Sequence, residues 1–429
     1  MQRHLWVPLL FLIAYLMTDN QKILDLTYEA GAILLENGAE ISRVEGTMRR
    51  MAEHFGMEDE SFFVLSNGII VTNEGYARSK FIPIKGASLD RVVAVNQLSR
   101  EVAAGQCTLE QIEERLKQIR AMKPKRAWEQ ILASAVGSAA FCILFGGGFT
   151  DCLASFIAGL VLWVFVLFVG SKHLSRIVST VTGGALSSLI CFGLYRIGLG
   201  SHLSNMIIGA IIPLIPGVAF TNGIRDMANE DYLAGTTRLL DAMLTFFCIA
   251  FGVALAFMLD GNIFGAILAL DPLVADPQTS GFIVQLIAAF LGTMAFAVLF
   301  GVPRKYYLDA GLCGTLGWLL YLILTRYSAF SPVEVMFCAT ALVTMVALAQ
   351  STARKCPITV FLISGIFPLV PGAGIFWTSY NIVSNQLPDA LHTGFAALKA
   401  TVAIAFGILV IMELNGKGPV RRWIEKKKK

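Results

Sequence analysis

Two segments of this chain interrupt an apolar sequence with prolines and a glycine. The first is "IIPLIPGVAFTN" and the second is "GIFPLVPGAGIF". The residues concerned are Pro213, Pro216 and Gly217 in the first segment and Pro368, Pro371 and Gly372 in the second. Proline removes one backbone N–H and blocks a second helical hydrogen bond, and glycine lets the chain leave helical geometry. In a membrane the freed backbone groups must face protein or water, so such breaks can bind a small ligand.

A half-helix that begins at such a break carries a partial positive charge at its N-terminus, which suits a carboxylate. A proline kink retained for packing explains one such segment equally well. Two segments at matched positions favour the ligand-binding interpretation. We therefore expect the substrate-binding residues to be the six residues of the breaks and two polar residues that follow them, Asn222 and Asn381.

Three charged residues within or beside apolar runs are candidates for coupling, because ionisable groups in a membrane are unfavourable and therefore often functional. Asp226 follows the first break by nine residues, as Asn381 follows the second. It is either a proton-coupling carboxylate or a loop-capping residue beside Arg225. Asp241 and Lys399 fall at related positions with opposite charges. They either pair with each other or extend to the membrane interfaces.

The composition indicates a membrane protein. Of 429 residues, 55% are hydrophobic and 15% are charged, against about 25% charged residues in an ordinary soluble domain. Apolar runs dominate from about residue 128 onward, and we expect ten membrane spans. The expected spans are Trp128–Phe145, Cys152–Val169, Ile177–Leu194, Asn205–Thr221, Leu239–Leu259, Phe282–Val302, Ala310–Leu324, Val335–Ala349, Ile358–Thr378 and Gly394–Met412.

Lysine and arginine are concentrated in alternate loops between these spans. One set of loops contains "SKHLSR", "GIRDMANEDYLAGTTR", "VPRKYY" and "STARK", whereas the other set has only Arg196 and Arg326 outside the spans. Positive residues mark the cytoplasmic side of a membrane protein. Both termini are therefore expected in the cytoplasm.

The two interrupted segments belong to a longer internal repeat. "IIGAIIPLIPGVAFTNGIRDM" aligns with "LISGIFPLVPGAGIFWTSYNI", and each copy is the fourth span in a group of five. An odd number of spans per repeat gives the two groups opposite orientations, which is typical of an inverted-repeat transporter. We expect a mainly α membrane protein with two inverted five-helix repeats, residues 127–262 and 263–414.

The more polar residues 20–126 are expected to form a cytoplasmic α+β domain of two helices, three short strands and two further helices. Turns are expected at Asn67-Gly68 and Glu74-Gly75. The expected helices are Leu24–Glu36, Ser42–Phe55, Leu89–Ala104 and Leu109–Met122. Residues 1–19 are a short apolar segment, which we expect to be an interfacial helix or a helix packed on this domain. Residues 415–429 are a basic cytoplasmic tail that can attract anionic lipid.

The expected soluble domain has no hydrolase, nucleotide-binding or metal-binding motif. We therefore expect no catalytic residue, no cofactor and no metal ion. Glu36, Glu40 and Asn67 are candidates for a gating or regulatory role. The competing interpretation is that Gly38 caps a helix, that Asn67 lies in a hairpin turn, and that the two glutamates are solvated or interdomain charges.

Several motifs together resemble one known family. "ILLENGAEISRVEGTMRRMAEHFGM", "LSNGIIVT" and "IPGVAFTNGIRDM" closely resemble the threonine/serine exporter (ThrE) family. The second half, with "AAFLGTMAFAVLFGVPRKYYLDAGLCGTLGW" and "ISGIFPLVPG", is similar to the smaller partner component of the same system. In some bacteria these parts are separate chains linked to succinate export. The resemblance covers nearly all of the chain after about residue 20 and implies export of small carboxylate-bearing metabolites from the bacterial cytoplasm.

The sequence therefore favours a secondary-active exporter of the bacterial inner membrane that works by alternating access. Its expected substrate is threonine and serine or a succinate-like dicarboxylate, and a proton gradient is the expected energy source because the chain has no ATP-binding motif. The expected partners are the substrate and the lipid bilayer, with a homo-oligomer left open and nucleic acid excluded by the absence of a basic, aromatic-rich face. The alternatives are a membrane-anchored hydrolase, in which the N-terminal domain and its Glu40 and His54 catalyse, and a non-transporting scaffold.

Overall fold

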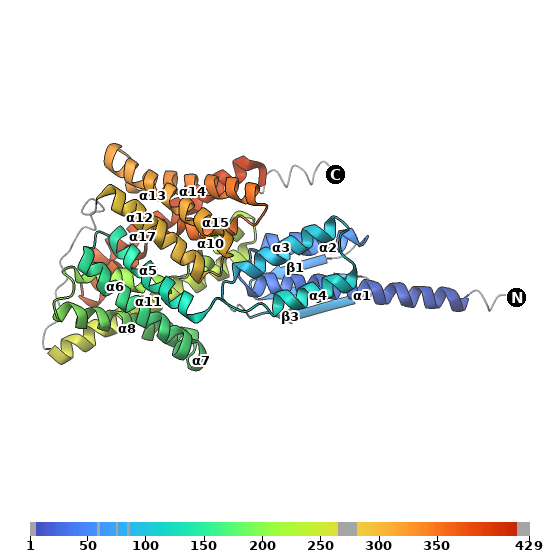
Figure 1. Ribbon diagram of the computed structural model, residues 1–429, viewed down its shortest axis with the longest axis horizontal. Coiled ribbons are helices and arrows are strands. Elements are labelled where there is room, and N and C mark those ends of the chain that lie inside the picture. The colour runs from blue at the N-terminus through green and yellow to red at the C-terminus, as the bar shows by residue number, and fades with distance from the viewer. Residues whose placement is uncertain (1–5, 58–60, 74–75, 84–85, 265–280, 418–429) are drawn as a thin grey trace.

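The computed structural model describes residues 6–57, 61–73, 76–83, 86–264 and 281–417. A large helical bundle lies at one end of the molecule, and the first four helices lie with the three strands at the other end (Figure 1). The N-terminal elements are α1 (Trp6–Glu36), α2 (Ile41–His54), β1 (Ser61–Leu65), β2 (Gly68–Asn73), β3 (Tyr76–Phe81), α3 (Leu89–Ala103) and α4 (Leu109–Arg120).

The three strands form one antiparallel sheet in the order β1-β2-β3. Leu65 of β1 pairs with Gly68 of β2, so the turn between them consists of Ser66 and Asn67. We predicted this turn one residue later, at Asn67-Gly68. The second predicted turn, Glu74-Gly75, lies outside the described residues. The inward-facing side chains of the sheet, among them Ile69 and Val71, are fully buried.

Helix α1 is continuous from Trp6 to Glu36, so the boundary that we predicted at residue 19 falls inside it. The residues around this point, "MTDNQK", contain neither proline nor glycine, and none of them ends a helix strongly. The N-terminal half of α1 projects away from the other elements (Figure 1).

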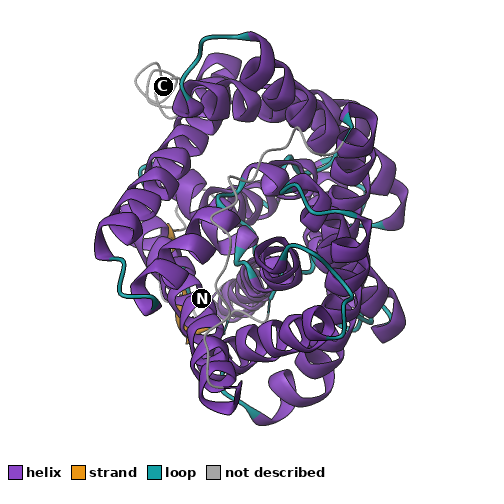
Figure 2. Ribbon diagram, turned by 90° about the vertical axis from the view of Figure 1, so that its left-hand side faces the viewer, coloured by secondary structure: helices purple, strands orange, loops and turns teal. Residues whose placement is uncertain are grey.

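The bundle begins with α5 (Ala127–Leu144) and ends with α17 (Leu387–Met412). Between them lie α6 (Phe149–Phe165), the π-helical η1 (Val166–Gly170), α7 (Ser171–His173), α8 (Arg176–Arg196), α9 (Leu203–Ile211), η2 (Ile212–Leu214), α10 (Gly217–Ala228), α11 (Tyr232–Phe264), α12 (Phe282–Leu299), η3 (Arg304–Tyr306), α13 (Tyr307–Tyr327), α14 (Pro332–Arg354), α15 (Thr359–Ile366), η4 (Phe367–Leu369) and α16 (Gly372–Val383), with η5 (Glu413–Lys417) after α17. Viewed from the end far from the strands, longer helices surround shorter inner ones (Figure 2).

Eight helices of the described chain are long and apolar enough to cross a membrane, and there are ten candidate spans if each of two bent helix pairs is one span. These bent pairs are the two segments that the prolines and glycines interrupt. The chain bends by 63° between residues 203–214 and 217–228, and by 49° between residues 359–369 and 372–382. The ten predicted spans correspond to the helices counted in this second way.

Both breaks have the same local geometry. In each, a helix ends in a 3₁₀ turn that contains the first proline, and a new helix begins at the glycine with the second proline as its N-cap. The amide of Gly217 donates to the carbonyl of Ile215 at 2.8 Å, and that of Gly372 donates to Val370 at 2.7 Å. The same sequence pattern therefore gives the same backbone path twice.

The two breaks pack against each other. A Cβ atom on Gly217 would lie 2.4 Å from Cε2 of Phe367, and one on Gly372 would lie 2.8 Å from the Cδ1 atoms of Ile212 and Ile215. The Phe367 ring in turn stacks on Phe296 of α12 with 3.8 Å between ring centroids. Glycine is therefore required in both helices by the close approach of the opposite break.

We expect Gly217→Ala to lower the thermal stability of the full chain, because the new methyl group must displace the stacked Phe367 ring. Overpacking of this kind costs about 1–3 kcal/mol. Gly193→Ala in α8 is the matched control, since a Cβ atom there meets nothing within 4 Å. Thermal unfolding of both variants in detergent measures the difference, and equal midpoints would contradict this account of the crossing.

Candidate functional site

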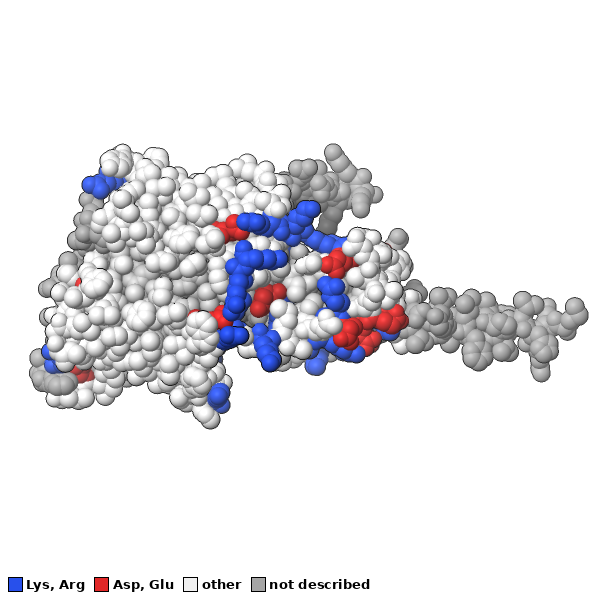
Figure 3. All heavy atoms as spheres, viewed as in Figure 1, with Lys and Arg blue, Asp and Glu red and all other residues white. Residues whose placement is uncertain are grey.

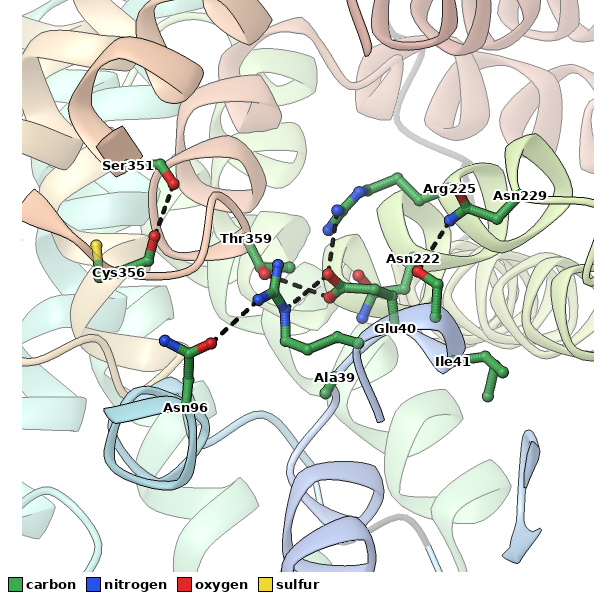
Figure 4. A network of polar contacts seen from close by, with 12 residues as sticks. Ala39, Glu40, Ile41, Asn96, Asn222, Arg225, Asn229, Ser351, Cys356 and Thr359 are labelled. Atoms are coloured by element: carbon green, nitrogen blue, oxygen red, sulfur yellow. Dashed lines mark hydrogen bonds and ion pairs between the residues drawn. The ribbon is translucent and has the colours of Figure 1, made fainter. Parts of the chain in front are cut away.

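The most extensive polar contact between the N-terminal elements and the bundle is made by residues 37–41, which we call the docking turn (Figure 4). Helix α1 ends here because Gly38 adopts a positive φ of 84°, a conformation that glycine reaches without a Cβ clash. The amide of Ala39 donates to the carbonyl of Leu34 at 3.0 Å and so completes the helix cap. This part of the Gly38 interpretation from the sequence is confirmed.

Side chains from α10 and α11 bind the backbone of the docking turn at three residues. The Asn222 amide donates to the carbonyl of Gly38 at 2.6 Å, and Arg238 donates to the carbonyl of Ala39 at 2.9 Å. The amide of Ile41 donates to Oδ1 of Asp226 at 3.0 Å. All three side chains are buried, so these hydrogen bonds form out of contact with solvent. They satisfy polar groups that would be costly to bury without a partner.

Glu40 is almost fully buried at the centre of this contact. Its Oε1 accepts hydrogen bonds from Arg43 at 2.7 Å and from Arg225 of α10 at 3.1 Å, and its Oε2 accepts from the hydroxyl of Thr359 at 3.3 Å. Burial opposes ionisation of Glu40, but the Arg225 and Arg43 guanidinium groups outweigh burial and hold the pKa of this carboxyl well below its usual range. Glu40 is therefore ionised at any physiological pH.

A second ion pair lies beside the first. Asp226, the residue after Arg225 on α10, pairs with Arg238 of α11, and both side chains are buried. Asn229 extends the contact by donating to Ser42 at 3.1 Å. We call the five charged residues of this contact the charged cluster; they are Glu40, Arg43, Arg225, Asp226 and Arg238.

Some polar atoms at this site are buried but have no hydrogen-bond partner among the residues that the structure describes. They include Nε and Nη1 of Arg225 and Oδ1 of Asn222. The two side chains lie one helical turn apart on α10, so their polar groups share one face. Guanidinium donors bind a carboxylate, and an amide oxygen accepts from an ammonium group. The site therefore has unused donors of the kind that bind carboxylates and an unused acceptor of the kind that binds ammonium groups.

A different kind of contact holds the start of α3. The amide of Leu89 donates to the carbonyl of Phe300 at 3.0 Å, and the amide of Asp90 donates to Gly301 at 2.9 Å. Both bonds join backbone to backbone. Gly301 has a positive φ of 70°, and a Cβ atom there would lie 3.1 Å from Cα of Ser88. The loop after α12 therefore approaches α3 directly, without charged side chains between them.

The structure brings Asn222 and Asp226 together with Glu40, and it brings the two breaks together. Asn381 is buried on α16, where its carbonyl accepts from the amide of Gln386 at 2.8 Å. Asp226 itself lies inside α10 and not in a loop, but its carboxylate accepts from the amide of Ile41 in the docking turn, which agrees with a capping role.

The predicted pair between Asp241 and Lys399 is not formed. Asp241 instead accepts from Arg176 of α8 at 2.8 Å, with 38% of its side chain exposed, and Lys399 is exposed on α17 with no ion pair among the described residues. Of the candidates in the N-terminal part, Glu36 pairs with Arg120 of α4 at 3.3 Å. Asn67 is exposed in its turn, as the hairpin interpretation expects.

Sequence reasoning did not identify Arg238 and Thr359. Arg238 lies in "GIRDMANEDYLAGTTR", which we predicted as a loop, whereas the structure has helix on both sides of a short turn at residues 229–231. The signal that could have identified the helix before this turn is the spacing of Arg225, Asp226 and Asn229, which lie at helical intervals.

Comparison with known proteins decides the family. The family model described as "Putative threonine/serine exporter" matches residues 25–260, and a second, described as "Threonine/Serine exporter, ThrE", matches residues 285–413. The first match alone covers more than half of the chain. The chain belongs to the threonine/serine exporter family. Its docking turn, α10 and the first break all lie within the first match, and the second break lies within the second match.

Two bacterial members of the exporter family align with nearly the whole chain. The "Threonine/serine exporter" of Corynebacterium glutamicum is 23% identical over 92% of this chain and 83% of its own length. The "Probable threonine/serine exporter" of Mycobacterium tuberculosis is 21% identical over 94% of this chain and 77% of its own length. The "Pheromone-regulated membrane protein 10" of Pichia sorbitophila is 22% identical over 54% of this chain and 24% of its own length. No solved structure matches the chain.

We expect Asp226→Asn to destabilise the protein strongly, because Arg238 would keep a buried charge without its partner. Loss of one member of a buried ion pair costs about 3–5 kcal/mol. Asp241→Asn is the matched control, since its exposed pair with Arg176 contributes only about 0–1 kcal/mol. Thermal unfolding in detergent compares the two, and a loss of the same size in both variants would show that the cluster does not hold the two parts together.

Proposed function

We propose that this protein is a secondary-active exporter of small carboxylate-bearing metabolites that works by alternating access in the bacterial inner membrane. The proposed substrate class is threonine and serine or a succinate-like dicarboxylate, with proton coupling. The printed names of the bacterial relatives support export of the two amino acids. The apolar helices of the bundle are consistent with a multi-pass membrane protein.

The observation that carries the proposal is the crossing of the two broken spans. Gly217 lies against Phe367 of the other break, and Gly372 lies against Ile212 and Ile215 of the first. Each break thus contacts the equivalent part of the other, as two copies related by a pseudo-twofold axis would. Inverted-repeat transporters place such breaks at the centre of the membrane, where the substrate binds.

In this structure the crossing is closed by side chains. Phe367 is buried, and its ring contacts Phe296, Phe300 and Phe141. Pro213 and Pro368 are buried, whereas Pro216 and Pro371 are half-buried. Opening the crossing on one side would expose the N-termini of α10 and α16, whose backbone N–H groups favour a carboxylate. We therefore place the central substrate site at the two breaks, with Asn222 and Asn381 following them.

The distribution of charge supports the proposed orientation. Lysine and arginine form a band where the bundle meets the N-terminal elements, and the side of the bundle in this view carries few charges (Figure 3). By the positive-inside rule, this band supports the proposed location of the N-terminal elements and both termini in the cytoplasm.

The coupling residues also belong to the proposal. Asp226 is the favoured coupling carboxylate because it is buried and contacts both α11 and the docking turn, so a change in its protonation would act on the contact itself. Asp241 and Lys399 are exposed in this structure and are the weaker candidates.

The hydrolase alternative has no support. The comparisons name exporters. Glu40 is held ionised by two arginines, which makes it a weak general base, because an efficient base needs a pKa near the working pH. His54 lies exposed at the end of α2.

Efflux from proteoliposomes tests the proposal. Vesicles that contain the full chain and are loaded with labelled L-threonine, L-serine or succinate should lose label faster than vesicles without protein, and an imposed pH gradient should change the rate. Failure to transport all three compounds would rule out the proposed substrate class, and a rate that ignores the gradient would rule out proton coupling.

The breaks are tested by the double substitution Pro216→Ala with Pro371→Ala. A more regular helix at both positions should reduce efflux by at least about tenfold, a transition-state change of about 1.4 kcal/mol, while the protein still folds. Pro332→Ala is the matched control, because Pro332 occupies the first turn of α14, where proline breaks no hydrogen bond. Unchanged efflux in the double variant would remove the breaks from the mechanism.

A further inference from the structure

The docking turn places the Glu40 carboxylate beside Arg225, a guanidinium group that has donors Glu40 does not use. Arg225 is 4% exposed, and one of its terminal nitrogens binds Glu40. Its Nε and Nη1 donors have no partner among the described residues. An arginine that is buried with unused donors is unfavourable, and a second anion at the same place would satisfy it.

We propose that Arg225 and Asn222 form a carboxylate-binding site at the cytoplasmic end of the transport path, and that the Glu40 carboxylate occupies this site as an internal competitor while the path is closed. The inference rests on the proposed export function and identifies the part of the substrate that is recognised first. Its ligand is an amino acid or another small carboxylate.

The charge of the cluster supports this assignment. Three guanidinium groups, those of Arg43, Arg225 and Arg238, face the two carboxylates of Glu40 and Asp226. The cluster therefore carries one net positive charge when all five groups are ionised. When Glu40 leaves Arg225, the positive charge of the remaining groups increases, so the site favours another carboxylate in its place and disfavours a cation.

The contacts of Glu40 are those that a substrate carboxylate would use. One oxygen accepts from Arg225 and the other accepts from the Thr359 hydroxyl at the start of α15. These two residues come from the two broken spans, so a carboxylate bound here connects both (Figure 4). The unpaired Oδ1 of Asn222 is available to an ammonium group, which suits an amino acid.

The position of the site fits an entry point. Arg225 lies eight residues after Gly217 on α10, which corresponds to about 12 Å along the helix. The docking turn and the following Ser42 cover this stretch, since a Cβ atom on Gly38 would lie 3.2 Å from Cγ1 of Val218 near the break and Ser42 accepts from Asn229 at the far end. Substrate can therefore reach α10 from this side only after the docking turn withdraws and Glu40 leaves Arg225.

Competition gives a measurable consequence. When the binding-competent state is only a fraction of the population, the apparent dissociation constant rises by the inverse of that fraction. Glu40→Gln removes the competing charge and keeps the size and the hydrogen-bonding capacity of the side chain. We expect it to lower the apparent Kd of the full chain for L-threonine by roughly tenfold, equivalent to about 1.4 kcal/mol.

Equilibrium binding of labelled L-threonine to the purified full chain in detergent tests this expectation. Glu29→Gln is the matched control, because it removes a carboxylate that pairs with Arg120 on the far side of α1. Unlabelled L-threonine methyl ester, which lacks the carboxylate, should compete no better in Glu40→Gln than in the wild type. An apparent Kd that is unchanged or higher in Glu40→Gln, or lowered equally in Glu29→Gln, overturns the proposal.

The double variant Glu40→Gln/Arg225→Gln keeps the test decisive if the single variant does not fold. It removes both charges of the fully buried pair, so the only charge that loses its partner Glu40 is that of Arg43, whose side chain is partly exposed. We expect it to fold and to lose L-threonine binding, and wild-type binding by this variant overturns the proposal. Efflux from wild-type proteoliposomes separates the two proposals. Normal efflux together with an overturned binding result would support export without this site. Absent efflux together with the expected binding result would support the site without transport.

Discussion

A helix that breaks inside a membrane must have its freed backbone groups covered, because lipid offers no hydrogen bond. In this protein two such breaks cover each other. Gly217 and Gly372 allow the two breaks to approach each other, and Phe367, Ile212 and Ile215 fill the space between them. The remaining bundle helices surround this crossing (Figure 2). Each break is therefore covered in part by the other, and this contact adds to the packing of α5 on α12 and of α11 on α16 between the two halves of the bundle.

The second constraint acts where the bundle meets the N-terminal elements. Glu40, Arg225, Asp226 and Arg238 are each almost fully buried, and separating any of them from its partner would leave a charge in a poorly hydrated place. The docked arrangement, with its pairs formed, satisfies every one of these charges, and the proposed withdrawal would have to continue until water reaches both sides. Partly separated arrangements are the unfavourable ones, which gives the contact the character of a switch.

The sequence predicted the elements well and the contacts poorly. Pro213, Pro216 and their repeats mark the breaks directly, because proline and glycine act on their own backbone. The contact between Asp226 and the amide of Ile41 joins residues 185 positions apart, and no local pattern specifies such a pair. We predicted a loop for the segment that holds Arg225 and Arg238 because it contains many charged residues. It is helical on both sides of a short turn, and the side chains of these two arginines are buried against protein.

Two of the contacts that attach the N-terminal elements to the bundle differ in physical kind. One is the charged cluster, whose strength depends on ionisation, ionic strength and competing anions. The other joins the backbone of Leu89 and Asp90 to that of Phe300 and Gly301, and it depends on none of these. A change in pH, salt or anion concentration would therefore weaken the charged edge of the junction and not the backbone edge. We expect such a junction to yield first at the charged cluster, while the bonds to Phe300 and Gly301 keep the N-terminal elements attached.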